Sequence, residues 1–262
     1  MNDIALQTQT YTAVYPSLRG KRVVVTGGGS GIGASIVAAF ARQGAQVSFL
    51  DIAVDESRAL ERSLGKSIPA PRFYDCDLRD LKAVNSTFAQ IAERFGAPEI
   101  LINNAGNDDR HAFESVTPDY WDDRLAVNLR HLFFCSQAVT PSMKAARRGV
   151  IINLGSVSWH LGLSNLAAYQ TAKAGIEGLT RALARELGEH GVRVTCIVPG
   201  GVRTPRQTTL WHTPEEEARI LAQQCLKIRV EPDDVASLAL FLASDDARAC
   251  TAHEYFVDAG WR

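Results

Sequence analysis

The chain lacks an excess of charge of either sign, because 28 lysines and arginines stand against 29 aspartates and glutamates, a formal net charge of −1 at pH 7. Without a basic field there is little attraction to nucleic acid or to an anionic membrane surface. Long apolar runs are missing too, and none approaches the length of a membrane span. We therefore expect neither a nucleic-acid partner nor a membrane partner.

Paired cysteines are also missing. The five cysteines are odd in number, widely spaced and free of any CxxC pair, and four of them lie within apolar runs. This pattern favours buried, reduced thiols over a disulfide framework or a zinc site. The first seventeen residues carry neither the basic segment nor the apolar segment of a signal peptide. We expect a cytoplasmic protein without a bound metal.

No proline- or serine-rich linker and no change of composition divides the 262 residues. This length suits one large α/β domain. We expect a loose tail over residues 1–17, which are rich in threonine and glutamine near the start, and a single domain over residues 18–262.

Short β-branched runs alternate with longer amphipathic stretches along the domain. The predicted strands are residues 21–26, 46–51, 72–76, 99–103, 150–154, 193–198 and 254–257. The predicted helices are residues 32–43, 55–64, 81–95, 118–147 and 167–190. This alternation predicts a parallel sheet covered by helices on both faces, with ligands bound beyond the carboxyl ends of the strands.

A glycine-rich turn joins the first predicted strand to the first predicted helix, where residues 26–33 read TGGGSGIG. Glycines let the backbone turn tightly and approach a pyrophosphate, and the following helix N-terminus offers amide donors. A glycine cluster alone could be a flexible turn. Its place between a strand and a helix favours binding of a dinucleotide phosphate.

Asp51 ends the second predicted strand, eighteen residues after Gly33. This is close to the interval expected for a carboxylate that bonds the adenosine ribose. Its charge would repel a 2′-phosphate, and neither Gly29 nor Ile52 supplies a compensating base, so NAD is favoured over NADP. The alternative role is an N-cap of the next helix, for which Asp55 is the better candidate.

Two further predicted strands end in candidate cofactor contacts. Asp77 and Leu78 follow the third strand and could bond the adenine edge, although Asp77 could equally cap a helix. Residues 103–106, NNAG, follow the fourth strand. Their backbone could pass beneath a cofactor, although asparagine and glycine also make ordinary turns.

A tyrosine and a lysine, Tyr169 and Lys173, stand four residues apart in a predicted helix. That spacing places them on one face, about 5–6 Å apart at Cβ. A tyrosine loses its proton only near pH ~10, and a neighbouring cation favours the phenolate. If the strand ending near Leu154 packs beside this helix, the intervening loop can bring Ser156 to the tyrosine. Taken alone the pair is a weak signal, because many such pairs lie on solvated helix faces.

Together these motifs resemble the short-chain dehydrogenase/reductase family over about residues 18–262. The residues that carry the resemblance are TGGGSGIG at 26–33, NNAG at 103–106, Asn128, Ser156, Tyr169, Lys173 and Pro199-Gly200. The resemblance implies a Rossmann-type, doubly wound sheet of seven parallel strands and assembly as a homotetramer. The helices at 118–147 and 167–190 would form its main dimer contact.

The resemblance also assigns roles. Tyr169 would be the general acid and base, activated by Lys173, which would also hold the nicotinamide ribose. Ser156 would orient the reacting oxygen, and Asn128 would hold a water that links the lysine to solvent. Many members carry a serine where this chain has Gly155. The expected cofactor contacts are Gly27, Ser30, Gly31, Ile32, Gly33, Asp51, Ile52, Asp77, Leu78, Asn104, Ala105, Gly106, Tyr169, Lys173, Pro199, Gly200, Val202 and Thr204.

The segments expected at the substrate end are residues 107–111, 157–161, 201–205 and the loop near 211–212. They combine tryptophan faces with hydrogen-bonding side chains, and a sugar needs both. A steroid or acyl pocket would be more apolar, although some of these polar groups could simply be surface residues. The candidate substrate contacts are Asn107, Asp109, Ser156, Trp159, His160 and Tyr169.

Longer stretches resemble the bacterial NAD-dependent sugar 1-dehydrogenases within this family: GNDDRH at 106–111, RHLFFCSQAV at 130–139, SWHLGL at 158–163, TRALARELG at 180–188 and HEYFVDAGWR at 253–262. They imply oxidation of an aldopentose at C1 to the lactone, with D-xylose as the expected sugar. Activity should rise with pH, because the reaction needs the phenolate of Tyr169.

Two other functions stay open. Arg203 and Arg206 lie where a carboxylate could be held, so a sugar-acid dehydrogenase or a ketone reductase is the second candidate. A regulator that senses NAD without turnover is the third. Such a regulator would not need the catalytic set Asn128, Ser156, Tyr169 and Lys173.

Overall fold

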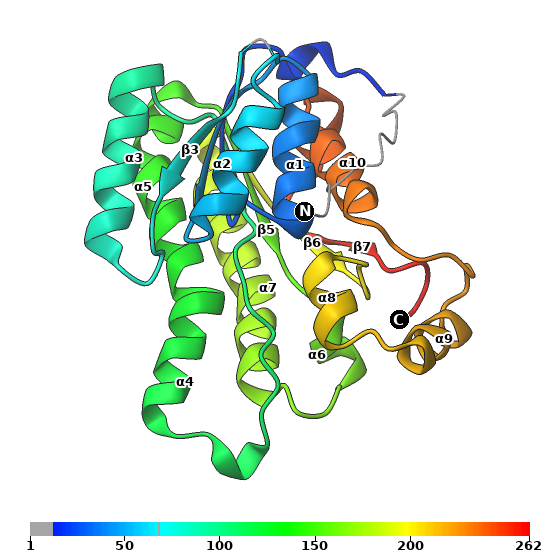
Figure 1. The fold of residues 1–262 in the computed structure, drawn as a ribbon. Coiled ribbons are helices and arrows are strands. Elements are labelled where there is room, and N and C mark those ends of the chain that lie inside the picture. Colours follow the sequence, from blue (N-terminus) through cyan, green and yellow to red (C-terminus); the bar gives the residue numbers. More distant parts are fainter. Residues whose placement is uncertain (1–12, 68) are drawn as a thin grey trace.

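A parallel sheet of seven strands in the order β3-β2-β1-β4-β5-β6-β7 forms the centre of the computed structural model (Figure 1), which describes residues 13–67 and 69–262. The strands are β1 Arg22–Thr26, β2 Gln46–Asp51, β3 Arg72–Asp75, β4 Ile100–Asn103, β5 Gly149–Leu154, β6 Val192–Pro199 and β7 Glu254–Val257. All seven match the predicted strands to within one residue at each end. The doubly wound parallel sheet is confirmed.

Alternate residues of the central strands pack on opposite faces of the sheet, as the two-residue period of a strand requires. In β1, Val23 and Val25 join one apolar cluster and Val24 joins another. In β4, Leu101 separates Ile100 and Ile102 in the same way. Because both faces are covered, these strands are apolar at nearly every position.

Helices cover both faces of the sheet (Figure 1). The first cluster contains side chains from α1, α2 and α10, and the second contains side chains from α3, α5 and α7. The helices are α1 Gly31–Arg42, α2 Val54–Ser63, α3 Leu81–Phe95, α4 Pro118–Leu125, α5 His131–Ala146, α6 Val157–Leu161, α7 Ala167–Leu187, α8 Pro205–Leu210, α9 Pro214–Gln223 and α10 Pro232–Ala243. The predicted helices at 32–43, 55–64 and 81–95 are α1, α2 and α3. The predicted helix at 167–190 is α7 with its short continuation η4, Gly188–His190.

The predicted helix over residues 118–147 is helical from residue 118 to residue 146, but it contains a π-helical turn that was not predicted. The helix α4 ends at Leu125, a π-helical turn η3 spans Ala126–Arg130, and α5 follows. Inside the turn, the Asn128 side chain donates to the carbonyl oxygens of Arg124 and Asn107, 3.0 Å each. A buried amide that bonds a neighbouring loop has local contacts that a period of 3.6 residues does not reveal.

The helices α6, α8, α9 and α10 were not predicted. Figure 1 shows α6, α8 and α9 together beyond the carboxyl ends of the strands, where the chain connects β5 to α7 and β6 to β7. The sheet order places β4 beside β1, so the switch point of the fold lies between these two strands.

Residues 1–12 of the expected tail lie outside the described residues. Of the remainder, Pro16–Leu18 form a short 3₁₀ turn, η1, and Leu18 is buried. The backbone amide of Tyr15 donates to the Gln43 side chain at 2.9 Å. Contacts with the domain therefore begin before residue 18.

All five cysteines are free thiols, and Cys76, Cys135 and Cys196 are buried. Within residues 13–67 and 69–262, no helix is both long enough and apolar enough to cross a membrane. The same part of the chain holds no group of histidine, cysteine or acidic side chains placed to bind a metal ion.

Candidate active site

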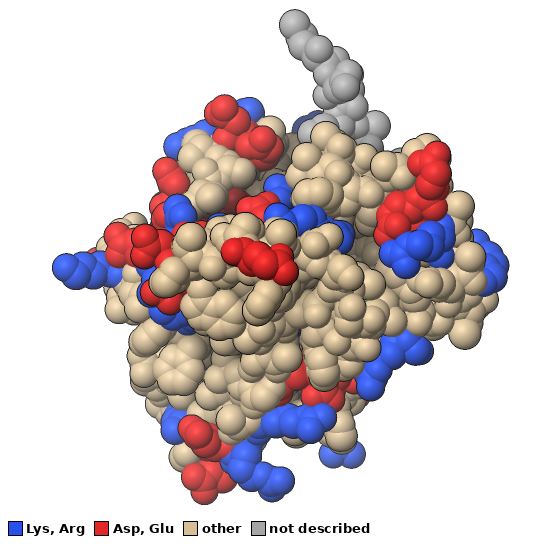
Figure 2. All heavy atoms as spheres, turned by 90° about the horizontal axis from the view of Figure 1, so that it is seen from below, with Lys and Arg blue, Asp and Glu red and all other residues tan. Residues whose placement is uncertain are grey.

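A cavity of about 530 Å³ opens at the carboxyl ends of β1, β2, β4, β5 and β6. All eighteen residues expected to contact a cofactor line it, as do Ser156 and Asn107. Charged side chains of both signs are interspersed over this side of the molecule (Figure 2) rather than gathered by sign. The fold thus brings segments from most of the chain's length to one cavity.

The glycine turn leaves no room for side chains where the backbone must come close. A Cβ atom at Gly33 would lie 1.9 Å from the carbonyl oxygen of Gly27, and one at Gly27 would lie 2.7 Å from the Cα of Ala105. Gly27 also has a φ of +64°, which favours glycine. The Ser30 side chain makes no capping bond to α1, so the first amides of the helix are available to an anion. This is the cradle that a dinucleotide phosphate fits.

The switch point is held together by hydrogen bonds between β1 and the NNAG turn. The Thr26 hydroxyl accepts from the backbone amides of Asn104 and Ala105, at 3.0 and 3.2 Å. The Asn104 side chain donates to the carbonyl oxygen of Gly27 at 2.8 Å. These bonds fix the floor of the cavity.

The Asp51 carboxylate lines the cavity and is held by two backbone amides. It accepts from Gly29 at 2.8 Å and from Ala53 at 2.9 Å. The N-cap position of α2 is Ala53, so neither Asp51 nor Asp55 caps that helix. Asp51 is therefore a fixed negative charge beside the glycine turn.

Asp77 also lines the cavity, and its carboxylate pairs with Arg79 at 2.7 Å. Hydrogen bonds from Arg79 hold the pKa of Asp77 below its ordinary value. The alternative that Asp77 caps a helix is wrong, because the side chain that caps α3 is Asp80.

Tyr169 and Lys173 lie in the first two turns of α7, beside the end of β5. The Lys173 ammonium donates to the carbonyl oxygen of Leu154 at 2.8 Å, and its nitrogen lies 5.4 Å from the centre of the Tyr169 ring. Burial lowers the pKa of Lys173 from its ordinary 10.5 to about 8. Burial also raises the pKa of the Tyr169 phenol, and Asp108 raises it further, whereas a hydrogen bond with Ser156 lowers it. The serine, tyrosine and lysine are thus brought together as predicted from their spacing.

Ser156 is the N-cap of the short helix α6. Its hydroxyl accepts from the backbone amide of Ser158 at 3.2 Å and donates to the Ser158 hydroxyl at 2.9 Å. Ser158 lines the cavity as well. The site therefore contains a second serine that sequence reasoning missed.

Asn128 does not line the cavity, because it is fully buried behind Asn107 and Gly106. Its side-chain oxygen accepts from the backbone amide of Asn107 at 2.7 Å. A Cβ atom at Gly106 would lie 3.2 Å from this oxygen and 3.3 Å from the Lys173 nitrogen. Asn128 and Lys173 thus approach the same short stretch of backbone.

His131 was also missed. It follows the π-helical turn, is fully buried, and its Nε2 donates to the carbonyl oxygen of Ala105 at 3.2 Å. Burial, together with the nearby Lys173, lowers the pKa of His131 to about 4. A neutral imidazole thus braces the NNAG turn beneath the cavity.

Three of the predicted substrate contacts do not line the cavity. Asp109 pairs with Arg124 at 2.7 Å and with Arg206 at 2.6 Å. Trp159 and His160 both bond the same carboxylate oxygen of the buried Glu177, at 2.8 Å each. The helical turn of α6 directs these two rings toward α7, because Glu177 offers a buried acceptor there.

In the loop after β4 the carboxylate that lines the cavity is Asp108, and it acts electrostatically on both Tyr169 and Lys173. Its carboxylate accepts from the Gln207 side chain on α8 at 2.8 Å. Asp108 belongs to the expected segment 107–111, but nothing in the sequence favours it over Asp109, and Gln207 lies outside the expected segments. Arg110, His212 and Trp261 line the cavity too and were not selected.

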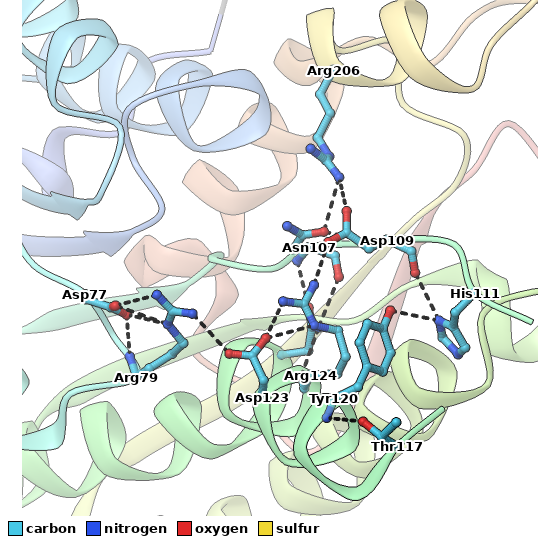
Figure 3. Close-up of polar contacts among 11 residues, drawn as sticks. Asp77, Arg79, Asn107, Asp109, His111, Thr117, Tyr120, Asp123, Arg124 and Arg206 are labelled. Carbon is cyan, nitrogen blue, oxygen red and sulfur yellow. Dashed lines mark hydrogen bonds and ion pairs between the residues drawn. The ribbon is translucent and has the colours of Figure 1, made fainter. Parts of the chain in front are cut away.

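An alternating row of charges joins several of the side chains that line the cavity (Figure 3). It runs through Asp77, Arg79, Asp123, Arg124, Asp109 and Arg206. At its end the Arg206 guanidinium bonds Asp109 and Asn107 and lies 3.5 Å from an oxygen of Asp108. Arg203 lies 3.6 Å from Glu217. Both arginines considered for a substrate carboxylate thus face carboxylates of the chain itself.

The chain is similar to several known dehydrogenases and to one family of reductases. A family model described as enoyl-(acyl carrier protein) reductase matches residues 27–262. The D-xylose 1-dehydrogenase of Caulobacter vibrioides is 61% identical over 251 residues, which cover 96% of this chain and 99% of that protein. A probable galactose dehydrogenase of Rhizobium meliloti is 48% identical over 94% of this chain and 96% of its own length. The crystal structure of a putative short-chain alcohol dehydrogenase from Sinorhizobium meliloti superposes with a TM-score of 0.89 at 33% identity, over 94% of this chain and 98% of that one.

Proposed function

The chain belongs to the short-chain dehydrogenase/reductase family, and from that premise we propose that it oxidises a neutral aldose at C1 with NAD as the hydride acceptor. The best candidate for the sugar is D-xylose, because the relative that is 61% identical is a D-xylose 1-dehydrogenase. D-galactose is the next, from the name of the relative at 48% identity.

The observation that carries the proposal is the pairing of charged side chains around Arg206 and Asp108, in the half of the cavity proposed to hold the sugar. Arg206 is neutralised by Asp109 and Asp108, and Asp108 itself faces the catalytic tyrosine and lysine. A substrate carboxylate that bound Arg206 would have to displace these pairs and would meet Asp108. The hydroxyls of a neutral sugar can instead donate to Asp108 and exchange hydrogen bonds with Gln207 and Ser158. This favours an aldose over a sugar acid.

In the proposed reaction the Tyr169 phenolate accepts the proton of the C1 hydroxyl. Ser156, whose hydroxyl is within hydrogen-bond reach of the Tyr169 phenol, would donate to the same oxygen and hold C1 in place. NAD held by the glycine turn and Asp51 would supply the acceptor for the hydride of C1. Loss of this proton and hydride from the cyclic sugar leaves the lactone. Lys173 contributes its positive charge beside the phenol, which favours the phenolate.

NAD is proposed rather than NADP because of Asp51. Its carboxylate is held in place by the amides of Gly29 and Ala53, so it cannot easily turn away from a ligand. A ribose hydroxyl can donate to it, whereas a 2′-phosphate would meet a like charge.

We further propose a cytoplasmic homotetramer. The five free cysteines suit a reducing compartment. The side chain of Phe133 on α5 is 45% exposed and packs against Phe134 at 5.3 Å between ring centres. An exposed phenylalanine beside a partly buried one on this helix suits the expected contact between subunits. Sedimentation analysis of the purified protein tests the assembly.

The experiment that tests the function measures NADH formation with NAD, and then NADPH formation with NADP, across a panel of substrates. The panel contains D-xylose, L-arabinose, D-galactose, L-fucose, D-glucose and matched sugar acids such as D-gluconate. We expect a strong NAD-dependent signal with one neutral sugar and none with the acids. Activity confined to an acid would shift the function to a sugar-acid dehydrogenase. Silence on every substrate would favour a non-catalytic regulator.

A further inference from the structure

The residues that follow β7 return to the cavity. Trp261 lines it, and the indole lies over the backbone of Gly201, because a Cβ atom at Gly201 would come within 3.1 Å of the ring. Ile220 of α9 lies beside the same glycine, at 3.3 Å from that position. Trp261 is 9% exposed and packs in one apolar cluster with Ile220 and Val157. Since Val157 directly follows Ser156, this cluster lies next to the catalytic serine.

One hydrogen bond holds the indole, and three more hold the backbone around it. Its Nε1 donates to the side-chain oxygen of Gln223, at the end of α9, at 2.9 Å. The carboxylate of Asp258 accepts from the amides of Gly260 and Arg262, at 2.9 and 3.0 Å. The carbonyl oxygen of Gly260 accepts from the amide of Cys225 at 3.0 Å. The tryptophan is therefore positioned before any ligand arrives.

The four tryptophans of the chain differ in this respect. Trp261 is among the residues that line the cavity, whereas Trp121, Trp159 and Trp211 are not. The Trp159 ring packs on the His160 ring, with 3.8 Å between ring centres. The Arg110 guanidinium lies over the Trp211 ring, 5.1 Å from its centre. Trp261 is thus the tryptophan whose surface borders the same cavity as Tyr169.

We infer that Trp261 is the platform on which the apolar C–H face of the sugar stacks, and that Gln223 is the positioning residue that orients it. The inference rests on the proposed function. A pyranose has a face of C–H groups and a rim of hydroxyls, so it needs an apolar plane together with hydrogen-bonding groups. The indole supplies the plane, and Asp108, Gln207 and Ser158 supply polar groups in the same cavity.

The test compares steady-state kinetics of the full-length Trp261→Leu and Trp261→Phe variants with those of the wild type. Leucine keeps an apolar side chain but removes the flat ring, so the KM for the sugar should rise about five- to tenfold. The KM for NAD and the kcat should stay within about twofold. Phenylalanine keeps a ring and should retain most of the affinity for the sugar. Trp159→Phe, the matched control, should leave the KM for the sugar unchanged.

Gln223 provides an independent pair of variants. Gln223→Glu keeps an acceptor for the indole nitrogen, and Gln223→Met removes it. We expect the methionine variant to raise the KM for the sugar about two- to threefold, and the glutamate variant to restore it. Sugar binding should also quench tryptophan fluorescence in the wild type and in Trp159→Phe, but not in Trp261→Phe.

Two outcomes overturn the inference, and they are distinguishable. If the wild type oxidises a sugar but Trp261→Leu leaves its KM unchanged, or raises the KM for NAD equally, the tryptophan is not the platform. If the wild type oxidises no neutral sugar, the proposed function fails and the inference fails with it.

Discussion

The half of the cavity proposed to hold the cofactor and the half proposed to hold the sugar are built by different means. Around the glycine turn, the groups that would meet a ligand are mainly backbone amides and short side chains at strand ends, such as Gly27, Gly33 and Asp51. Around Asp108, they are long side chains from the loop after β4, from α8 and from the residues after β7. The first half depends on local turn geometry and the second on contacts between distant segments.

Because of this difference, substitutions in the two halves should affect different ligands. A substitution in the cofactor half should alter the choice or affinity of the dinucleotide and leave the sugar unaffected. A substitution in the substrate half should do the reverse. Tyr169 and Lys173 line the cavity where the two halves meet, so changes there should affect catalysis.

The largest effect is expected from Tyr169→Phe, which removes the hydroxyl but keeps the ring. Without a group that accepts the proton, kcat should fall by about a thousandfold. Binding of NAD, measured by calorimetry, should stay close to that of the wild type, because the change adds no charge and little strain. Appreciable residual turnover would show that another residue is the base.

Asp51→Ser tests the cofactor half. Removing the fixed carboxylate takes away the repulsion of a 2′-phosphate, so the ratio of kcat/KM with NAD to that with NADP should fall by about tenfold or more. The KM for the sugar should not change. Asp55→Ser is the control, because Asp55 is exposed in the first turn of α2. An unchanged ratio in Asp51→Ser would mean that another feature selects the dinucleotide.

Asp108→Asn tests the substrate half. Loss of the charged acceptor should raise the KM for the sugar about tenfold and leave the KM for NAD unchanged.

The same substitution should also change how kcat depends on pH. Asp108 adds to the raised pKa of Tyr169, so removing its charge lowers that pKa, and the alkaline rise of kcat should move to lower pH. A profile that moves the other way, or stays in place, would argue against Asp108 facing the phenol.

The smallest effect concerns the stability of the protein without cofactor. Burial lowers the pKa of Lys173 to about 8 in the folded protein, against an ordinary value of 10.5. Between pH 8 and pH 10.5 this lysine holds its proton more fully in the unfolded chain than in the folded protein. Its contribution therefore makes the free energy of unfolding larger as the pH rises. Relative to Lys173→Met, the wild type should become more stable from pH 7 to pH 10, by on the order of 2 kcal/mol.

Urea unfolding at several pH values measures this difference. Lys82→Met is the matched control, because Lys82 is exposed on α3 and its substitution should change stability equally at each pH. A constant difference between the wild type and Lys173→Met would mean that the lysine does not titrate in this range.

The strands were predictable because both faces of this sheet are buried. Runs such as 23–25 and 100–102 are apolar at each position, and this pattern is visible in a window of a few residues. The helices α1, α2, α3 and α7 show equally local signals. The family and the narrower resemblance to sugar dehydrogenases are confirmed by the relatives, since the motifs that carry them are short and contiguous.

The predictions failed where a residue's role depends on a partner far along the chain. The π-helical turn at 126–130 contains Asn128, whose side chain bonds the distant Asn107. The orientation of Trp159 and His160 follows from Glu177, seventeen residues or more away. The residues next to each of these positions give no indication of which distant residue it will bond.

The sequence by itself determined the order of the seven strands and of the helices α1, α2, α3 and α7 along the chain, the glycine turn, the charge at Asp51, and the spacing that joins Ser156, Tyr169 and Lys173. Each of these depends on the period of a helix or strand, or on the conformational freedom of glycine, which act over a few residues. Only the tertiary structure decided which of Asp108 and Asp109 faces the tyrosine, that Arg206 is neutralised by the chain's own carboxylates, and that Trp261 rather than Trp159 borders the cavity. These outcomes depend on which distant segment supplies the partner that satisfies a buried polar group, and that is settled only when the chain has packed.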